Sequence, residues 1–359
     1  MSSLNSRIQA FHQLGEYLRL LVDHNYQGVS DSILPFNGND HFKSLQAQLI
    51  DYLENSNHYN AWFTQENIRF SLNEWAELLK ENQLQSWLYE YQITEQKKPK
   101  TIGVVMAGNI PMVGFHDYLS ILLSGNKLIA KLSSGDNKLI PLLNEMLGFI
   151  DADLAQKAQF THDQLINFDA IIATGSNNTS RYFEYYFGKH PHIIRKNRNG
   201  VAVLTGEETD QQLSELARDV FLYFGLGCRN VSKVFVPEKY EFNKMFESFE
   251  TYNYLHNHAK YYNNYEYQKA IYLVNITRHR DNGFLLLKDD LAYSSPIGVL
   301  YFEEYADLEN LKKKLHGDSD QIQCIVGDTF LDFGSTQKPR LDEYADGVDT
   351  MAFLSKLSS

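Results

Sequence analysis

Cysteine is scarce in this sequence, with only Cys228 and Cys324 among 359 residues. Two cysteines this far apart build no disulfide framework and match no metal-ligand spacing, so we expect no metal, and they fit a reducing compartment. Long apolar runs are also missing. None approaches the roughly 18 residues of a membrane helix, and the first residues lack an apolar core of signal-peptide length. We therefore expect a cytoplasmic protein without a membrane span.

Positive charge is the second shortage. The formal net charge is −12, which argues against a nucleic-acid partner because such proteins need a basic footprint. An anionic ligand would need a local basic patch, and residues 97–100 (KKPK) and 192–198 (HIIRKNR) offer two. Hydrophobic residues make up 43% and charged residues 22%, which is typical of globular proteins. The length allows two domains.

The hydrophobic pattern changes at Thr101. Residues 1–95 read as helices, with Ser71 as a candidate N-cap because Glu74 follows three residues later. After Thr101, short apolar runs alternate with helical patterns, an order typical of a doubly wound α/β domain with a mostly parallel sheet. The expected strands are 101–108, 126–133 and 168–175, and the expected helices are 111–125, opened by a proline, 136–150 and 177–188.

A second series of strands and helices follows, so we expect a second α/β domain. Its expected strands are 200–206, 231–237, 284–290, 298–305 and 321–327, and its expected helices are 209–225 and 307–317. The segment after Phe333 is rich in Gly and Asp and looks like a returning arm. The pattern predicts four parts: a helical N-terminal region (1–95), two α/β domains (96–198 and 199–332) and a C-terminal arm (333–359).

Polar residues stand where the first three strands end, and ligands bind at the carboxyl ends of strands in such sheets. Asn109 fits either a ligand contact or a turn, because Asn tolerates left-handed backbone. Lys131 either reaches a ribose or phosphate or extends into solvent. The loop ATGSNNTSR (173–181) fits a phosphate-binding helix N-terminus as well as an ordinary turn capped by Ser176 or Asn177.

Cys228 lies in YFGLGCRNVSKVFV (223–236), after two glycines and before an apolar strand. A free cysteine is often a small buried hydrophobe. A thiol beside a cation instead has a lowered pKa and becomes a nucleophile, and Arg229 follows directly. Cys324 lies inside an apolar strand, so we assign it to the core.

The order of these features resembles the aldehyde dehydrogenase superfamily and, more closely, the LuxC-type acyl-CoA reductases. The resemblance spans roughly residues 100–359 and rests on four segments, VVMAGNIPMVGFHDYLSILLSGNKLIAKLSS, IIATGSNNTSRYFEYYFGKHPHIIRKNRNGVAVL, YFGLGCRNVSKVFVP and YADGVDTMAFL. It implies an aldehyde-dehydrogenase-like fold of two doubly wound parallel-sheet domains. The helical region would pack on the first, nucleotide-binding domain, the second would carry the catalytic cysteine, and the arm would return to the cofactor domain or to an oligomer interface. It also favours a homo-oligomer, a dimer or larger.

The resemblance also implies roles for individual residues. Cys228 would be the nucleophile, and Asn109 would help to form the oxyanion hole. Lys131 would contact the adenosine ribose and, with Ser133 or Ser134, would lie where the 2′-phosphate of NADPH is met. The implied cofactor-binding residues are Lys131, Ser133, Ser134, Thr174, Gly175 and Ser176.

The implied reaction is the NADPH-dependent reduction of a fatty acyl-CoA, or of an acyl-carrier thioester, to an aldehyde through a Cys228 acyl-enzyme. Arg195, Lys196 and Arg198 either bind the anionic cofactor or CoA or form a solvated charge run. His116 could act as an acid or base near Asn109. A lone His on a helix is more often packed or at the surface, so it is left out of the catalytic set.

The sequence departs from the oxidising dehydrogenases at two points. Those carry a Glu in a LELGGK-like stretch that activates water, whereas residues 192–204 hold no carboxylate, which argues for the reductive direction. Ser180 stands where many members have a second Gly, which leaves the cofactor pose open. Two alternatives remain: a Cys-dependent acyltransferase or thioesterase that uses no nicotinamide, and a non-catalytic acyl-CoA-binding protein on the same fold.

Overall fold

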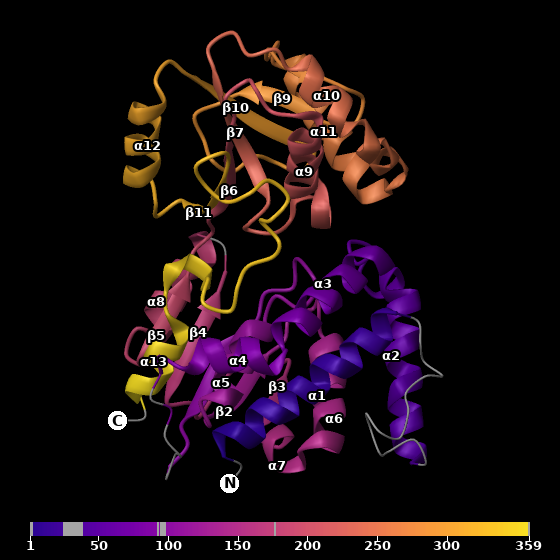
Figure 1. Cartoon of the computed structure of the whole chain (residues 1–359), viewed down its shortest axis with the longest axis vertical. Helices are drawn as coiled ribbons and strands as arrows, with labels where there is room; N and C mark the ends of the chain where they lie inside the picture. The colour runs from indigo at the N-terminus through magenta and orange to yellow at the C-terminus, as the bar shows by residue number, and fades with distance from the viewer. Residues whose placement is uncertain (1–2, 24–38, 92, 94–97, 176, 358–359) are drawn as a thin grey trace. The chain divides into compact units, whose positions relative to one another are not determined.

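The computed structural model describes residues 3–23, 39–91, 93, 98–175 and 177–357. The chain divides into two compact units (Figure 1). The first unit is Met1–Lys196 with Arg340–Ser359, and the second unit is Asn197–Pro339. Each unit has a β-sheet of its own.

The first unit is built on a five-stranded sheet in which all neighbours are parallel, in the order β3-β2-β1-β4-β5. The strands are β1 (Thr101–Val105), β2 (Lys127–Lys131), β3 (Ala158–Thr161), β4 (Ala170–Thr174) and β5 (His192–Arg195). The chain runs outward from β1 to β3 and then crosses to the other side of β1 for β4 and β5. The strand order therefore reverses at β1.

Helices cover both faces of this sheet, because right-handed crossovers put α5 and α6 on one face and α8 on the other. The helices of the unit are α1 (Leu4–Val22), α2 (Asp40–Tyr59), α3 (Gln65–Leu78), α4 (Glu81–Leu88), α5 (Phe115–Leu123), α6 (Leu139–Ile150), α7 (Ala152–Ala155), α8 (Asn177–Phe187), the 3-10 turn η3 (Ala345–Gly347) and α13 (Thr350–Leu357). The N-terminal helices pack against α5 and α6 and share one hydrophobic core with the sheet, so they form a further layer of the unit (Figure 1).

The C-terminal segment belongs to the first unit. α13 contacts α5, and Met351 and Leu354 are buried in the common core. The indole N–H of Trp87 in α4 donates to the hydroxyl of Tyr344 at 2.8 Å. The segment therefore joins α4 and α5 through both apolar packing and hydrogen bonds.

The second unit is built on a six-stranded sheet in the order β11-β6-β7-β10-β9-β8, parallel except where β8 pairs antiparallel with β9. The strands are β6 (Asn199–Val203), β7 (Val231–Pro237), β8 (Arg280–Asp281), β9 (Leu286–Asp289), β10 (Val299–Tyr305) and β11 (Ile322–Val326). The helices are α9 (Asp210–Phe221), α10 (Asn243–Phe249), α11 (Ala259–Val274), α12 (Leu308–Gly317) and the 3-10 segments η1 (Leu222–Gly225) and η2 (Glu250–Asn257). Leu311 and Leu315 of α12 pack on Phe235 of β7, whereas Tyr265 of α11 packs on Leu286 of β9.

The predicted α/β architecture is confirmed, and each run predicted as a strand contains one. Both sheets are parallel or mostly parallel, as expected, and the short β8 adds one antiparallel pairing at the edge of the second sheet. β3, β5 and β8 were not predicted. β5 was not recognised because segment 192–198 is rich in basic residues and has no continuous apolar run. Only alternate residues of this strand are buried.

Two predicted helix starts are also corrected. The helix expected from Pro111 begins at Phe115, because residues 111–114 form a turn in which Met112 has a φ of 63°. Ser71 is not an N-cap. Thr64 caps α3 instead, and the buried hydroxyl of Ser71 donates to the carbonyl of Pro111 at 3.3 Å.

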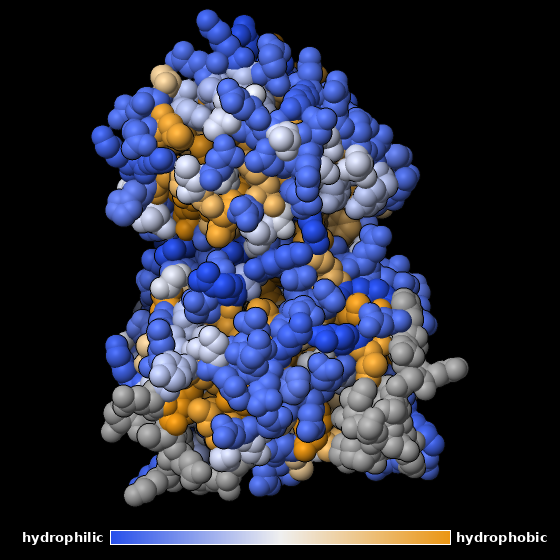
Figure 2. Space-filling view, viewed as in Figure 1, coloured by the Kyte–Doolittle hydropathy of each residue, from blue (hydrophilic) through white to orange (hydrophobic). Residues whose placement is uncertain are grey.

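The surface in view is mainly hydrophilic in both units, with smaller hydrophobic areas between the polar ones (Figure 2). This fits a sequence in which charged residues make up 22%. Among the residues that the structure describes, no helix combines the length and the apolar character that a membrane crossing requires.

Candidate active site

The carboxyl-terminal edge of the first sheet gathers the polar residues that follow its strands. Val105 at the end of β1 is in register with Lys131 of β2 on one side and with Ala173 of β4 on the other. Neighbouring strands lie about 5 Å apart, so the loops after β2, β1 and β4 leave the sheet side by side. The strand order reverses at β1, and ligands bind at such a switch point in sheets of this type.

Asn109 is exposed in the loop that leaves β1. This loop interlocks with the one after β2. A Cβ on Gly108 would lie only 2.5 Å from Oγ of Ser133, and a Cβ on Gly135 would lie 2.6 Å from the carbonyl oxygen of Gly108. Ser133 is therefore part of the contact between the two loops, whereas Ser134 is exposed beside it.

Asp136 holds the β1 loop in place, and the sequence analysis did not single it out. Its Oδ2 accepts the N–H of Met112 at 3.2 Å, and the residue is 6% exposed. Met112 has left-handed backbone, which is rare and strained outside glycine, so this bond stabilises a turn that the chain would not adopt unaided. Burial raises the pKa of Asp136 to about 6. The only sequence signal is a Gly-Asp pair after a strand, which is typical of any turn.

The other predicted cofactor residues lie at the same edge. Lys131 and Thr174 are the half-buried last residues of β2 and β4. A Cβ on Gly175 would lie 2.9 Å from the ring of Phe183, so glycine is needed there for α8 to start close to the sheet. Ser176 lies outside the described residues.

Cys228 belongs to the second unit, where it occupies the second position of a tight turn before β7. The N–H of Asn230 donates to the carbonyl of Gly227 at 3.0 Å, and the side-chain Oδ1 of Asn230 accepts the N–H of Gly227 at 2.8 Å. The turn is closed by two hydrogen bonds, and neither uses the N–H of Cys228. Because Cys228 is exposed, it is not part of the core.

A strained backbone segment leads into this turn. Tyr223, Phe224 and Gly225 are consecutive left-handed residues with φ values of 54°, 59° and 75°. Two aromatic residues in this conformation cost of the order of 1–3 kcal/mol each. Both are buried, and the ring of Phe224 stacks on His258 with centroids 4.2 Å apart. Strain of this kind persists only where the surroundings fix it, which is typical of functional sites.

The segment around Thr336 packs against the Cys228 turn. Nε of Arg229 donates to the carbonyl of Thr336. The carboxylate of Asp219 in α9 accepts the N–H groups of Gly334 at 2.7 Å and of Thr336 at 3.0 Å. Cys324 is 7% exposed in β11, with its Sγ 3.5 Å from the carbonyl oxygen of Arg229, so its assignment to the core is confirmed.

β6 brings no carboxylate to this turn. A Cβ on Gly200, near the amino end of β6, would lie 2.4 Å from the carbonyl oxygen of Arg229, so this end of the strand touches the turn. Glu208 follows the opposite end of β6. It is 3% exposed and accepts the N–H groups of Thr205 at 2.5 Å and of Gly206 at 3.2 Å. Its oxygens therefore close a local loop away from Cys228.

The three basic residues of segment 192–198 have different environments. Arg195 is 6% exposed, forms a bidentate pair with Asp117 at 2.6 and 2.8 Å, and donates to Oγ1 of Thr350 at 3.0 Å. Both roles considered for Arg195, binding of an anionic ligand and membership of a solvated charge run, are wrong, because its guanidinium is buried and paired with the carboxylate of Asp117. Lys196 is exposed beside Glu184, and Arg198 is half-buried with its guanidinium 3.4 Å from the carbonyl oxygen of Ser319.

His116 is a packed residue. Its Nε2 lies 2.9 Å from the carbonyl oxygen of Leu341, and its ring lies 5.5 Å from Trp87 and 5.4 Å from Tyr344. Burial lowers the pKa of His116, which favours the neutral ring. These contacts give it a structural role.

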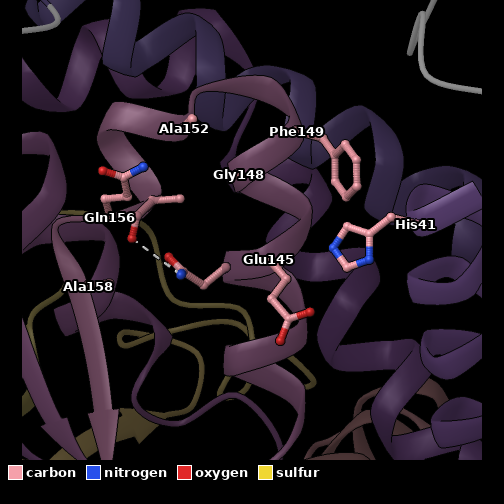
Figure 3. A pocket seen from close by; sticks show the side chains of 9 residues that line it. His41, Glu145, Gly148, Phe149, Ala152, Gln156 and Ala158 are labelled. Atoms are coloured by element: carbon pink, nitrogen blue, oxygen red, sulfur yellow. Dashed lines mark hydrogen bonds between the residues drawn. The ribbon is translucent and has the colours of Figure 1, made fainter. Parts of the chain in front are cut away.

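A separate pocket of about 450 Å³ lies between α2, α6, α7 and β3 (Figure 3). His41, Glu145 and Phe149 line one side (Figure 3), and among the other lining residues Asn144 donates to the carbonyl of Ala155 at 3.3 Å. Ala158 is the first residue of β3, so the pocket is at the amino-terminal edge of the sheet, opposite the strand-end loops. None of the nine described lining residues is a Cys, Ser, Thr or Lys, so the pocket offers no thiol, hydroxyl or amine nucleophile.

Solved structures similar to this chain are aldehyde dehydrogenases. Aldehyde dehydrogenase 21 from Physcomitrella patens, solved with succinate, is 13% identical, with a TM-score of 0.58 over 88% of this chain and 71% of that one. The NADP-dependent glyceraldehyde-3-phosphate dehydrogenase of Bacillus halodurans is 12% identical, with a TM-score of 0.57 over 92% and 75%. An aldehyde dehydrogenase of Mycobacterium tuberculosis, solved with NAD+, is 14% identical, with a TM-score of 0.52 over 86% and 70%. These likenesses confirm the predicted aldehyde-dehydrogenase-like fold.

Sequence comparison gives the family. No curated protein sequence matches the chain significantly. The profile of the acyl-CoA reductase (LuxC) family matches residues 38–250, more than half of the chain. The match includes Asn109, Lys131 and Cys228. The chain therefore belongs to the acyl-CoA reductase (LuxC) family.

Proposed function

We propose that this protein reduces a fatty acyl thioester, carried by CoA or by an acyl-carrier protein, to an aldehyde with NADPH, through an acyl-enzyme on Cys228. The observation that carries the proposal is the exposed thiol on a doubly closed turn, next to strained backbone, in a chain of this family. A cysteine that is exposed and rigidly held is better suited to act as a nucleophile than to fill space in the core.

The first step is acyl transfer. The thiolate of Cys228 attacks the carbonyl carbon of the thioester, the bond from that carbon to the CoA sulfur breaks, and CoA leaves as its thiolate. The backbone N–H of Cys228 and the side-chain amide of Asn109 donate to the oxygen that becomes negative. Such donors stabilise developing charge and are usually the largest contribution to catalysis of this kind.

A nicotinamide cofactor fits the residues at the carboxyl-terminal edge of the first sheet. The edge combines a switch point, glycines at 108 and 175 that leave no room for a side chain, and the start of α8 close to the sheet. Lys131, Ser133, Ser134, Thr174, Gly175 and Ser176 would hold the cofactor. When bound, the reduced cofactor supplies a hydride to the carbonyl carbon of the acyl-enzyme. Hydride addition would leave the alkoxide of a thiohemiacetal on Cys228, and breakage of its carbon–sulfur bond would release the aldehyde and restore the Cys228 thiolate.

The test is the mass of the protein after it is mixed with dodecanoyl-CoA and no NADPH. We expect the wild type to gain one acyl group on the peptide that holds Cys228, and Cys228→Ala to gain none. Cys324→Ala is the matched control, because its thiol is buried in β11, and it should be acylated as the wild type is. Normal acylation of Cys228→Ala would exclude the mechanism. Acylation without consumption of NADPH would instead indicate an acyltransferase or thioesterase, and an unmodified wild type would indicate a binding protein.

A further inference from the structure

We infer that Asn230 is a positioning residue of the proposed reaction, because its side chain joins the end of α9, the strained segment and the turn that carries Cys228. The inference rests on the proposed function and adds a residue to it. Asn230 lies in direct contact with Gly227 rather than with any reacting atom, so it acts through Cys228.

The amide of Asn230 binds the end of α9. Its Nδ2 lies 3.0 Å from the carbonyl oxygen of Asp219 and 2.8 Å from that of Leu222. The last carbonyls of a helix have no partner within the helix and must be satisfied elsewhere. α9 ends without a glycine cap, at a Leu222 whose backbone is not helical, so the Asn230 amide serves as the cap. It also fixes the carbonyl immediately before the left-handed residues.

The oxygen of Asn230 fixes the turn itself. Oδ1 accepts the N–H of Gly227, and the backbone N–H of Asn230 donates to the carbonyl of Gly227, so both polar groups of the residue before Cys228 are bound to one residue. Asn230 is 2% exposed, which shields these bonds from water. The backbone N–H of Asn230 therefore holds the peptide that carries the N–H of Cys228, and its side chain holds the peptide just before it, between Leu226 and Gly227.

The strained segment lies between these two attachments. Asn230 binds the carbonyl of Leu222 before it and the N–H of Gly227 after it. The left-handed stretch Tyr223–Gly225 is held from both sides, and without the side chain of Asn230 the strain can be released by movement of the turn. The buried carbonyl of Asp219 and the half-buried N–H of Gly227 would lose this partner at the same time, which adds to the cost.

The test compares the wild type with Asn230→Ala and Asn230→Asp. The measurements are the rate of Cys228 acylation by dodecanoyl-CoA, followed by mass, and the KM for NADPH. A displacement near 1 Å at a reacting centre costs up to about 100-fold in rate, so we expect acylation to fall by at least about tenfold while the KM for NADPH stays unchanged. Asn230→Asp keeps the size of the side chain but not the amide donor, and it provides the test if Asn230→Ala does not fold. A folded variant of either kind that is acylated at the wild-type rate would overturn the inference.

Asn126→Ala is the matched control. Asn126 is also fully buried, and it too uses both halves of its amide, accepting the N–H of Lys100 at 3.0 Å and donating to Oγ of Ser124 at 3.0 Å. It precedes β2, at the sheet edge away from the strand-end loops. Its loss should lower the free energy of unfolding as Asn230→Ala does, but should leave the acylation rate unchanged. An equal fall in acylation would assign the effect to general destabilisation and overturn the inference.

Hydrogen exchange separates this inference from the proposed function. The amide hydrogen of Gly227 should exchange slowly in the wild type and fast in Asn230→Ala, whether or not the protein is a reductase. Fast exchange in the wild type would overturn the positioning role. A wild type that is not acylated, but in which the Gly227 amide is protected by Asn230, would instead refute the proposed function.

Discussion

At the scale of single residues, Asn109 and Cys228 carry the proposed chemistry. Asn109 follows β1 at the strand-order reversal and is exposed. We expect Asn109→Ala to lower kcat by roughly 10²–10³-fold, the usual cost of one oxyanion donor, with little change in the free energy of unfolding. Asn109→Asp keeps the shape but replaces the donor by an acceptor, so it should be at least as defective. Steady-state kinetics with chemical denaturation will check this, and nearly normal kcat in both variants would return Asn109 to the role of a turn residue.

Lys131 gives the second prediction at this scale. We propose that its ammonium group meets the 2′-phosphate of NADPH, which NADH lacks. Lys131→Met should therefore raise the KM for NADPH more than the KM for NADH. Lys127→Met is the control, because Lys127 is exposed at the first position of the same strand, and it should change neither KM. Equal effects of Lys131→Met on both cofactors would mean that Lys131 does not contact the phosphate.

At this scale, the sequence predicted a residue's role only where neighbouring residues in the chain indicated it. Cys228, Asn109 and Lys131 were proposed as site residues because glycines or strand ends flank them. Asn230 and Asp136 were not singled out, because each also binds a residue farther along the chain, 8 positions away for Asn230 with Leu222 and 24 for Asp136 with Met112. Arg195 was misjudged for the same reason, since its partner Asp117 lies 78 positions earlier and no local pattern distinguishes a buried arginine from a solvated one.

At the scale of elements, the loop after β1 is held by one buried carboxyl group. Asp136 accepts the N–H of Met112 from that loop and the N–H of Leu139 at the start of α6. It therefore links the β1 loop to the β2–α6 connection. The same bonds explain why α5 begins at Phe115 and not at Pro111, which no property of the α5 sequence alone would reveal.

The pKa of Asp136 predicts a pH dependence of stability. The pKa is raised from 3.8 to about 6 in the folded protein, so the folded state keeps its proton longer than the unfolded chain does. The contribution of Asp136 to the free energy of unfolding is full below about pH 4 and is lost as the pH rises through about 6. The loss is at most about 3 kcal/mol, from 1.36 kcal/mol for each pKa unit.

Asp136→Asn has no carboxyl group to titrate at this position, so a comparison with the wild type isolates the contribution of Asp136. The difference in the free energy of unfolding, wild type minus variant, should fall as the pH rises from about 4 to about 7, the window set by the two pKa values. Urea unfolding at several pH values measures it. A difference that stays constant or grows with pH would show that Asp136 does not carry a raised pKa.

At the scale of the whole molecule, the sequence predicted the fold more completely than it predicted the polar interactions. Apolar runs predicted the strands because burial on both sheet faces demands continuous hydrophobic segments. The pairing of charged groups did not follow, because it depends on which elements become neighbours. The direction of the proposed reaction depends on which groups surround the Cys228 thiol.

The last prediction concerns that direction. Hydrolysis of an acyl-enzyme needs a general base, which is worth typically 10²–10⁴-fold. In the described part of the second unit, the end of β6 that touches the Cys228 turn has no carboxylate, Asp219 is bound to the 334–336 segment, and Glu208 closes a loop at the far end of β6. We therefore expect the acyl-enzyme to outlast a catalytic turnover in water without NADPH, and free CoA to reverse it. The mass of the protein over time measures both, and aldehyde supplied with NADP but without CoA should release little carboxylic acid. Rapid release of free acid in either assay would show that another group activates water, and would assign the protein to the oxidising dehydrogenases or the thioesterases.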